Sequence, residues 1–186
     1  MAVAFAALFV ALAGTALSQG TPPPGTPPAT CNGLAATIVG TEGSDELRIN
    51  GTPGPDVGTP GPDVIVGLGG GDILMGGAGD DVICGGDGRD ELRGGRGNDT
   101  LLGEAGKDAL GDRHGNDTLL GGPGGDFLGA GPGNDTLLGG PGKDWLFGEA
   151  GKDLCVGGPG KDIDRVLHNG SFIAPVPWKC EVKKSI

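Results

Sequence analysis

GGRGNDTLL, residues Gly94–Leu102, decides the fold of this chain, because the same nine-residue unit recurs on both sides of it. Counted in nines from residue 58, twelve consecutive blocks follow one another and end at residue 165. The fourth residue of every block is Gly and the sixth is Asp. Such internal repetition predicts a stacked array, in which each unit buries its apolar side against its neighbours.

The composition agrees with an array and excludes several other classes. The 186 residues include 43 Gly, 15 Pro and no Tyr, whereas collagen has a period of three and disordered Gly-rich and Pro-rich chains have none. The net charge of −11 argues against nucleic-acid binding, which needs clustered Lys and Arg. The negative charge favours a cationic partner such as metal ions. A merely solvated acidic surface would not need the regular spacing that the Asp residues have.

Each block reads as a six-residue turn followed by a strand of three residues. Side chains alternate along a strand, so the seventh and ninth residues face outward and the eighth faces inward. The eighth residues are aliphatic ten times in succession and then become Cys and Asp. We therefore expect two blocks to complete one coil, with two stacks of parallel strands around a thin core. The eighth-place row is Ile65, Leu74, Ile83, Leu92, Leu101, Leu110, Leu119, Leu128, Leu137, Leu146, Cys155 and Asp164.

Such a core is too small to hold the fold alone. Burying one Leu contributes about 1.5–3 kcal/mol, whereas ordering nine residues costs roughly 1–2 kcal/mol for each residue. The sixth-place carboxylates would also stack about 4.8 Å apart, and such like charges repel. Calcium fits this arrangement because it takes six to eight carboxylate and carbonyl oxygens in flexible geometry, whereas magnesium demands a tighter octahedron. Zinc would want clustered Cys or His, and the two His residues, His114 and His168, are far apart.

The blocks GGRGNDTLL, GGPGKDWLF and GPGNDTLLGG match the pattern G-G-x-G-x-D-x-U-x, in which U is a large aliphatic residue. Over about two-thirds of its length the chain thus resembles the RTX (haemolysin-type) calcium-binding repeat. The resemblance implies an all-β fold, a right-handed parallel β-roll or two-stack β-solenoid. The ends of a solenoid need caps, and we expect disulfides to tie the terminal caps of this one. It also implies calcium bound between neighbouring coils by the first six residues of each block.

Carried over to this chain, the resemblance predicts that the sixth-place aspartates are the metal ligands. Each is expected to pair with the aspartate two blocks further on, giving at most ten calcium sites. Departures from the pattern are expected to weaken some sites, because Asp112 and Ala130 replace the first Gly, and Glu104, Arg113 and Glu149 replace the second. The predicted ligands are Asp63, Asp72, Asp81, Asp90, Asp99, Asp108, Asp117, Asp126, Asp135, Asp144, Asp153 and Asp162.

The chain departs from the large members of that family. It has no pore-forming segment and no His-Glu-x-x-His zinc motif, so toxin and protease activities do not carry over and we expect no enzymatic activity and no catalytic residue. It looks more like the short Sec-exported calcium-binding proteins of bacteria. The alternative is a calcium-stabilised adhesin or cell-surface interaction module, with Trp145 or Phe127 on a binding face. A protein or glycan partner stays open.

The remaining segments predict an exported protein. Residues 1–18 hold the apolar run AVAFAALFVALAGTALS, typical of a secretory signal, with an uncleaved anchor as the alternative. Residues 19–30 form a Pro-rich linker. Residues 31–57 contain an N-terminal cap and irregular repeats, 58–165 the β-roll, and 166–186 an aromatic-containing C-terminal cap. We expect the mature protein to be secreted, with no membrane contact after cleavage and with cell-wall association left open.

Within the irregular segment, Gly40–Arg48 already reads as one repeat, whereas Asp56 is out of phase and a doubtful ligand. Four Cys in an exported chain allow three disulfide connectivities. We expect Cys31–Cys84 and Cys155–Cys180, each closing one end of the array. Three N-D-T triplets, which begin at Asn98, Asn116 and Asn134, read formally as glycosylation acceptors, but their spacing of 18 residues marks them as repeat consensus.

Overall fold

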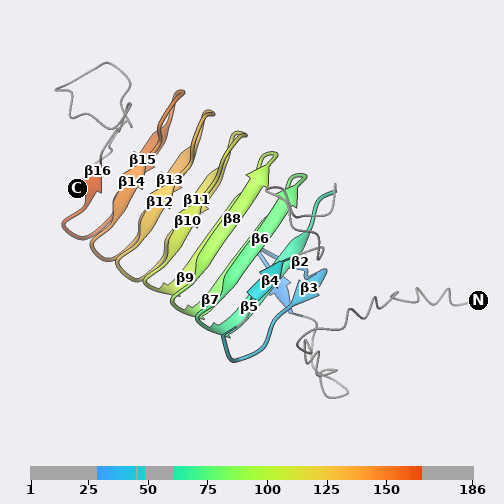
Figure 1. Cartoon of the computed structure of the whole chain (residues 1–186). Coiled ribbons are helices and arrows are strands. Elements are labelled where there is room, and N and C mark those ends of the chain that lie inside the picture. The colour runs from blue at the N-terminus through green and yellow to red at the C-terminus, as the bar shows by residue number, and fades with distance from the viewer. Residues whose placement is uncertain (1–28, 45, 49–60, 165–186) are drawn as a thin grey trace, which may run out of the picture.

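The computed structural model describes residues 29–44, 46–48 and 61–164, which fold as β-strands and turns (Figure 1). Successive strands alternate between two seven-stranded sheets in which all pairs are parallel. The first sheet holds β3 (Ile38–Val39), β5 (Val64–Gly70), β7 (Val82–Gly88), β9 (Thr100–Gly106), β11 (Thr118–Leu120), β13 (Thr136–Leu138) and β15 (Leu154–Val156). The second holds β4 (Glu46–Arg48), β6 (Ile73–Ala78), β8 (Glu91–Arg96), β10 (Ala109–Gly111), β12 (Phe127–Gly129), β14 (Trp145–Phe147) and β16 (Ile163–Asp164).

The strand register confirms the predicted coil. Thr118 pairs with Thr136 and Leu110 with Leu128, so each strand lies beside the strand that follows two blocks later. The coils therefore stack side by side from β3 and β4 at the N-terminal end to β15 and β16 at the other end (Figure 1). The chain is a two-stack β-solenoid, as the period predicts.

The core is the single row of eighth-place side chains. From Ile65 to Cys155 each of these residues is at most 1 % exposed, and together with Ala130 they form one continuous cluster. The seventh-place residues Val64, Thr100 and Trp145 are half-buried on the outer faces. The predicted inward and outward sides are therefore confirmed.

The strands differ in length between the two halves of the roll. The expectation of three-residue strands holds from β10 to β15, but β5 to β9 run on for six or seven residues through the glycine-rich turn. In the N-terminal half the third residue of the turn keeps its N–H, and Gly69 donates to the carbonyl oxygen of Thr41. In the C-terminal half the third residue is Pro at 123, 132, 141 and 159, and Pro has no N–H to donate. Strands β10 and β14 are equally short although His114 and Ala150 stand at that place in the turns that follow them, so Pro accounts for only part of the difference.

The fourth-place glycines are required by the close approach of neighbouring coils. A Cβ atom on Gly142, whose φ is +157°, would lie 1.4 Å from the carbonyl oxygen of Gly124 in the preceding coil. A side chain there would push two coils apart. The same kind of contact recurs from Gly70 to Gly160, because the two-block coil brings main chain against main chain, and it explains why these places admit only Gly.

The N-terminal segment adds a hairpin that the sequence analysis did not anticipate. In this predicted N-terminal cap, β1 (Thr30–Cys31) and β2 (Leu34–Ala35) pair antiparallel before β3 begins. The turn between them is Asn32-Gly33, with φ of 51° and 80°. An Asn-Gly pair is the strongest short-range signal for such a hairpin, so the sequence did carry it.

The predicted Cys31–Cys84 disulfide is present, and its cysteines are separated by 53 residues in sequence. Cys31, Cys84 and Val66 form a second small apolar cluster. Val66 and Cys84 are ninth-place residues, which point away from the main core. The disulfide therefore fastens the hairpin to the outer side of the first sheet and does not close the end of the coil stack. That end is formed by β3 and β4.

The Gly40–Arg48 repeat occupies its expected place, since Leu47 pairs with Leu74. That pair is three blocks apart, whereas Leu74 and its next partner, Leu92, are two blocks apart. The first pair of strands in each sheet is therefore 27 residues apart in sequence, whereas the next pair is 18 residues apart.

Several predictions fall outside the part of the chain that the structure describes. Asp56 lies outside the described residues, as do the predicted signal segment, the linker and the C-terminal cap. Cys155 is disulfide-bonded, and its pairing with Cys180, which also lies outside the described residues, stays a prediction. No helix able to cross a membrane occurs in residues 29–44, 46–48 and 61–164.

Candidate metal centre

The sixth-place aspartates form two buried rows, one along each edge of the roll where the turns enter the strands. Each Asp immediately precedes a strand, so its main chain is held by the parallel ladder; the N–H of Thr118, for example, donates to the carbonyl oxygen of Asp99. From Asp72 to Asp144 these residues are at most 2 % exposed, whereas Asp63 and Asp153 near the ends are 9 % and 8 % exposed. Carboxylates are rarely buried to this degree without a compensating partner.

From Asp81 to Asp162, one oxygen of each sixth-place carboxylate has a main-chain partner. The Oδ1 atom accepts a hydrogen bond from the N–H of the Asp that stands 18 residues earlier, over 2.7–3.1 Å. The pairs brought together are the ten that were predicted. They are Asp63/Asp81, Asp72/Asp90, Asp81/Asp99, Asp90/Asp108, Asp99/Asp117, Asp108/Asp126, Asp117/Asp135, Asp126/Asp144, Asp135/Asp153 and Asp144/Asp162.

The other oxygen of most of these carboxylates has no such partner. Along the rows from Asp81 to Asp144 every Oδ2 atom is buried without a hydrogen-bond partner. A Cβ atom on Gly103 would lie 2.8 Å from Oδ2 of Asp108 and 2.6 Å from the carbonyl oxygen of Gly121. The first-place glycine thus keeps open a small space that a carboxylate oxygen and a carbonyl oxygen both face. The same arrangement recurs at Gly85, Gly121 and Gly139.

This donor set fits calcium. Carboxylate and main-chain carbonyl oxygens are the ligands that Ca²⁺ prefers, and Ca²⁺ accepts flexible geometry. No Cys or His accompanies the acidic groups in any cluster of possible ligands among the described residues, so the chemistry of a zinc site is not present there. An ion between coils would give each orphaned Oδ2 the partner that it lacks.

Burial is the main cause of the raised pKa values of these carboxylates. It raises the pKa of Asp81, Asp108, Asp135 and Asp144 to about 6 from the ordinary 3.8, and that of Asp117 to about 7. Hydrogen bonds from main-chain N–H groups act in the opposite direction, and the charges of neighbouring aspartates raise the pKa further. Desolvation raises these pKa values more than repulsion between the stacked carboxylates does.

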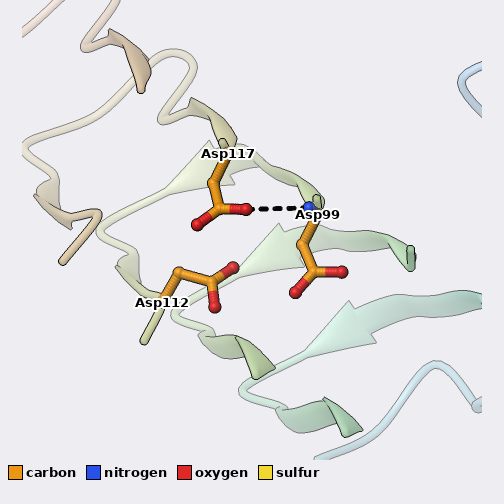
Figure 2. A group of neighbouring side chains, drawn as sticks. All are labelled: Asp99, Asp112 and Asp117. Atoms are coloured by element: carbon orange, nitrogen blue, oxygen red, sulfur yellow. Dashed lines mark hydrogen bonds between the residues drawn. The ribbon is translucent and has the colours of Figure 1, made fainter. Parts of the chain in front are cut away.

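Sequence reasoning missed the role of Asp112. It was counted as a defect because it replaces a first-place glycine, but its carboxylate lies beside those of Asp99 and Asp117 (Figure 2). The nine-residue pattern has no acidic first residue, so the only available signal was the charge itself.

A second missed feature is a stack of exposed side chains at the fifth place. Oδ1 of Asn98 accepts from the N–H of Asn116, and Oδ1 of Asn116 from that of Asn134, each over 2.9 Å. Asp80 and Lys152 continue the stack at its two ends. This bonding gives the three N-D-T triplets a structural reason to recur at a spacing of 18 residues.

Comparison with known proteins places the chain in a family. The pattern of the RTX calcium-binding nonapeptide repeat matches in four copies, at residues 57–92, 85–110, 113–128 and 129–164. These matches cover more than half of the chain and coincide with the regular coils. No curated protein matches the chain. The period, the two-sheet solenoid and the matched repeats together show that this chain belongs to the RTX calcium-binding nonapeptide repeat family.

Proposed function

We propose that the chain is a secreted, non-enzymatic calcium-binding β-roll that folds when calcium binds between its coils. The observation that carries the proposal is the row of buried Oδ2 atoms without hydrogen-bond partners, from Asp81 to Asp144. An unpaired buried charge is costly, and a divalent cation between coils removes this cost. Calcium binding free energy then becomes folding free energy.

The twelve sixth-place aspartates, from Asp63 to Asp162, would supply the carboxylate ligands, and glycine carbonyls of the turns would supply the rest. Each Asp between the two ends has a partner one coil before and one coil after it, which gives at most ten sites. The ion would supply charge neutralisation between the coils.

Calcium dependence is tested by circular dichroism in EGTA and then in millimolar calcium. We expect a disordered spectrum in EGTA at neutral pH and a β spectrum in calcium. An equal β signal in both conditions would contradict folding linked to the metal. Native mass spectrometry then counts the bound calcium ions. If the protein binds none, the proposed function is wrong.

The N-terminal residues 1–18 support export, and low calcium before export would keep the chain unfolded during translocation. The mass of the protein recovered outside the cell tests this part. We expect a mature chain that begins at Gln19. A full-length chain retained with the cells would show that the segment is not removed.

A specific observation favours a second function, that of an adhesin module. Phe127 is 50 % exposed, its ring lies 4.8 Å from that of Phe147, and it pairs in register with Trp145 on the outer face of the second sheet. Lys143 stands over the Trp145 ring at 5.6 Å. A glycan or cell-binding assay with Phe127→Ala and Trp145→Ala tests whether this face binds a partner, and equal binding by both variants and the wild type would argue against it.

A further inference from the structure

Asp112 stands where nearly every other block has glycine, and its side chain changes the local turn. Its Oδ1 accepts hydrogen bonds from the N–H groups of Gly95, at 2.8 Å, and Arg113, at 2.7 Å. Among the described second-place residues, Arg113 alone lacks the positive φ that the others adopt. The substitution of Gly by Asp therefore reorganises this turn.

The Asp112 carboxylate takes the part that a main-chain carbonyl plays elsewhere. The second-place N–H groups of Gly122 and Gly140 donate to the carbonyl oxygens of Gly139 and Gly157 in the next coil. The equivalent N–H of Gly95 donates instead to Oδ1 of Asp112, in the side chain of the next coil. The carboxylate of Asp112 therefore lies in the space between these two coils.

The second oxygen of Asp112 points toward the predicted ligands. A Cβ atom on Gly94 would lie 2.1 Å from Oδ2 of Asp112 and 2.4 Å from Oδ2 of Asp99, so both oxygens face the same small space. Carboxylate oxygens of Asp99, Asp112 and Asp117 lie within 4.8 Å of one another (Figure 2). All three Oδ2 atoms are buried without a hydrogen-bond partner, and Asp99 and Asp117 are each 1 % exposed.

We propose that Asp112 is an additional cation ligand and that Asp99, Asp112 and Asp117 form the tightest divalent-cation site of the roll. The inference rests on the proposed function, since it assumes that ions bind between coils. Affinity for Ca²⁺ rises with the number of charged ligands and with the rigidity of the site. This site has three carboxylates where the pattern supplies two, and it lies midway along the solenoid, where coils on both sides hold it.

The experiment is a calcium titration by calorimetry, with ions counted by native mass spectrometry, on the wild type and three variants. Asp112→Asn keeps the shape and the Oδ1 acceptor but removes the charge, so we expect the tightest binding step to weaken by about tenfold or more. Asp112→Gly restores the repeat pattern and should weaken the same binding step. It keeps the inference testable if Asp112→Asn does not fold. Ala130→Gly is the matched control, because it restores the first-place glycine one coil further along the same edge; we expect it to leave the tightest step unchanged.

Two results would overturn the inference. Unchanged affinity in Asp112→Asn and Asp112→Gly would show that the carboxylate takes no part in binding. One more bound ion in Asp112→Gly than in the wild type would show that Asp112 fills the space of an ion. If the wild type still binds several calcium ions, either result leaves the proposed function intact. If the wild type binds no calcium, the proposed function itself is wrong.

Discussion

Without calcium, the roll should fold when the solution is acidified. Asp108 shows the reason most simply: it is 2 % exposed, and burial raises its pKa to about 6 from 3.8. The folded protein therefore holds this proton more tightly than the unfolded chain does. The stability that Asp108 contributes is fully present below about pH 3.8 and is lost as the pH rises through about 6.

The magnitude follows from the same values. A pKa difference of one is worth about 1.4 kcal/mol, so ionising Asp108 in the folded state without a cation costs about 3 kcal/mol. Asp81, Asp135 and Asp144 have pKa values raised to about the same level. Since a whole domain is stable by only about 5–15 kcal/mol, a few such groups suffice to unfold the metal-free roll at neutral pH.

The assay is circular dichroism in EDTA between pH 8 and pH 4, at low concentration, with sedimentation to confirm a monomer. We expect the β signal to appear as the pH falls through about 6. Equal β signals at pH 7.5 and pH 4.5, or a loss of signal on acidification, would refute the reasoning.

A matched pair of variants separates this effect from general charge repulsion. Asp108→Asn imitates the protonated acid, so the metal-free variant should begin to fold at a higher pH, while its affinity for calcium falls. Asp87→Asn removes the same charge from an exposed position. A shift of equal size in both variants would show that net charge, and not burial, controls the transition.

Three further predictions concern the calcium-loaded roll, each measured by thermal or urea unfolding. Leu101→Ala removes a fully buried core side chain and should lower stability by about 2–5 kcal/mol; a change below about 0.5 kcal/mol would contradict a closely packed core. Gly142→Ala places a Cβ 1.4 Å from a carbonyl oxygen one coil earlier and should lower stability by about 3 kcal/mol or more. The control is Gly111→Ala, whose Cβ would have nothing within 4 Å and which should leave stability nearly unchanged. Equal effects of the two substitutions would refute the contact argument. Paired replacement of Cys31 and Cys84 by Ser opens a loop spanning 53 residues and should cost about 4 kcal/mol in the chain-entropy model, and unchanged stability would show that the hairpin is held by packing alone.

Much of the fold could be predicted from the sequence because the repeat is strict. A period of nine, with an aliphatic residue at the eighth place, determines which side of each strand faces inward, and Leu101 and Leu119 lie where that pattern puts them. The spacing of two blocks likewise places Asp99 beside Asp117. These features depend only on the order of residues along a regular coil.

Other features depend on contacts that the pattern does not contain. The hairpin of β1 and β2 rests on the outer side of the first sheet through Cys31, although its Asn32-Gly33 turn was visible in the sequence. The strands become short from β10 onward, and four of the later turns have Pro, which has no N–H to donate, at their third place. Neither the docking side of a hairpin nor the hydrogen bond that a Pro removes is visible until the partner strand is in place.

The sequence by itself determined the period, the coil, the inward row and the two rows of aspartates, because each is a consequence of regular spacing. Only the tertiary structure decided what each carboxylate oxygen does. Oδ1 of Asp117 is satisfied by a main-chain N–H one coil away, whereas its Oδ2 remains without a partner. The tertiary structure also turned Asp112 from an apparent defect into a neighbour of two predicted ligands. Both outcomes depend on how main chains from successive coils approach one another, and spacing along one chain does not specify this approach.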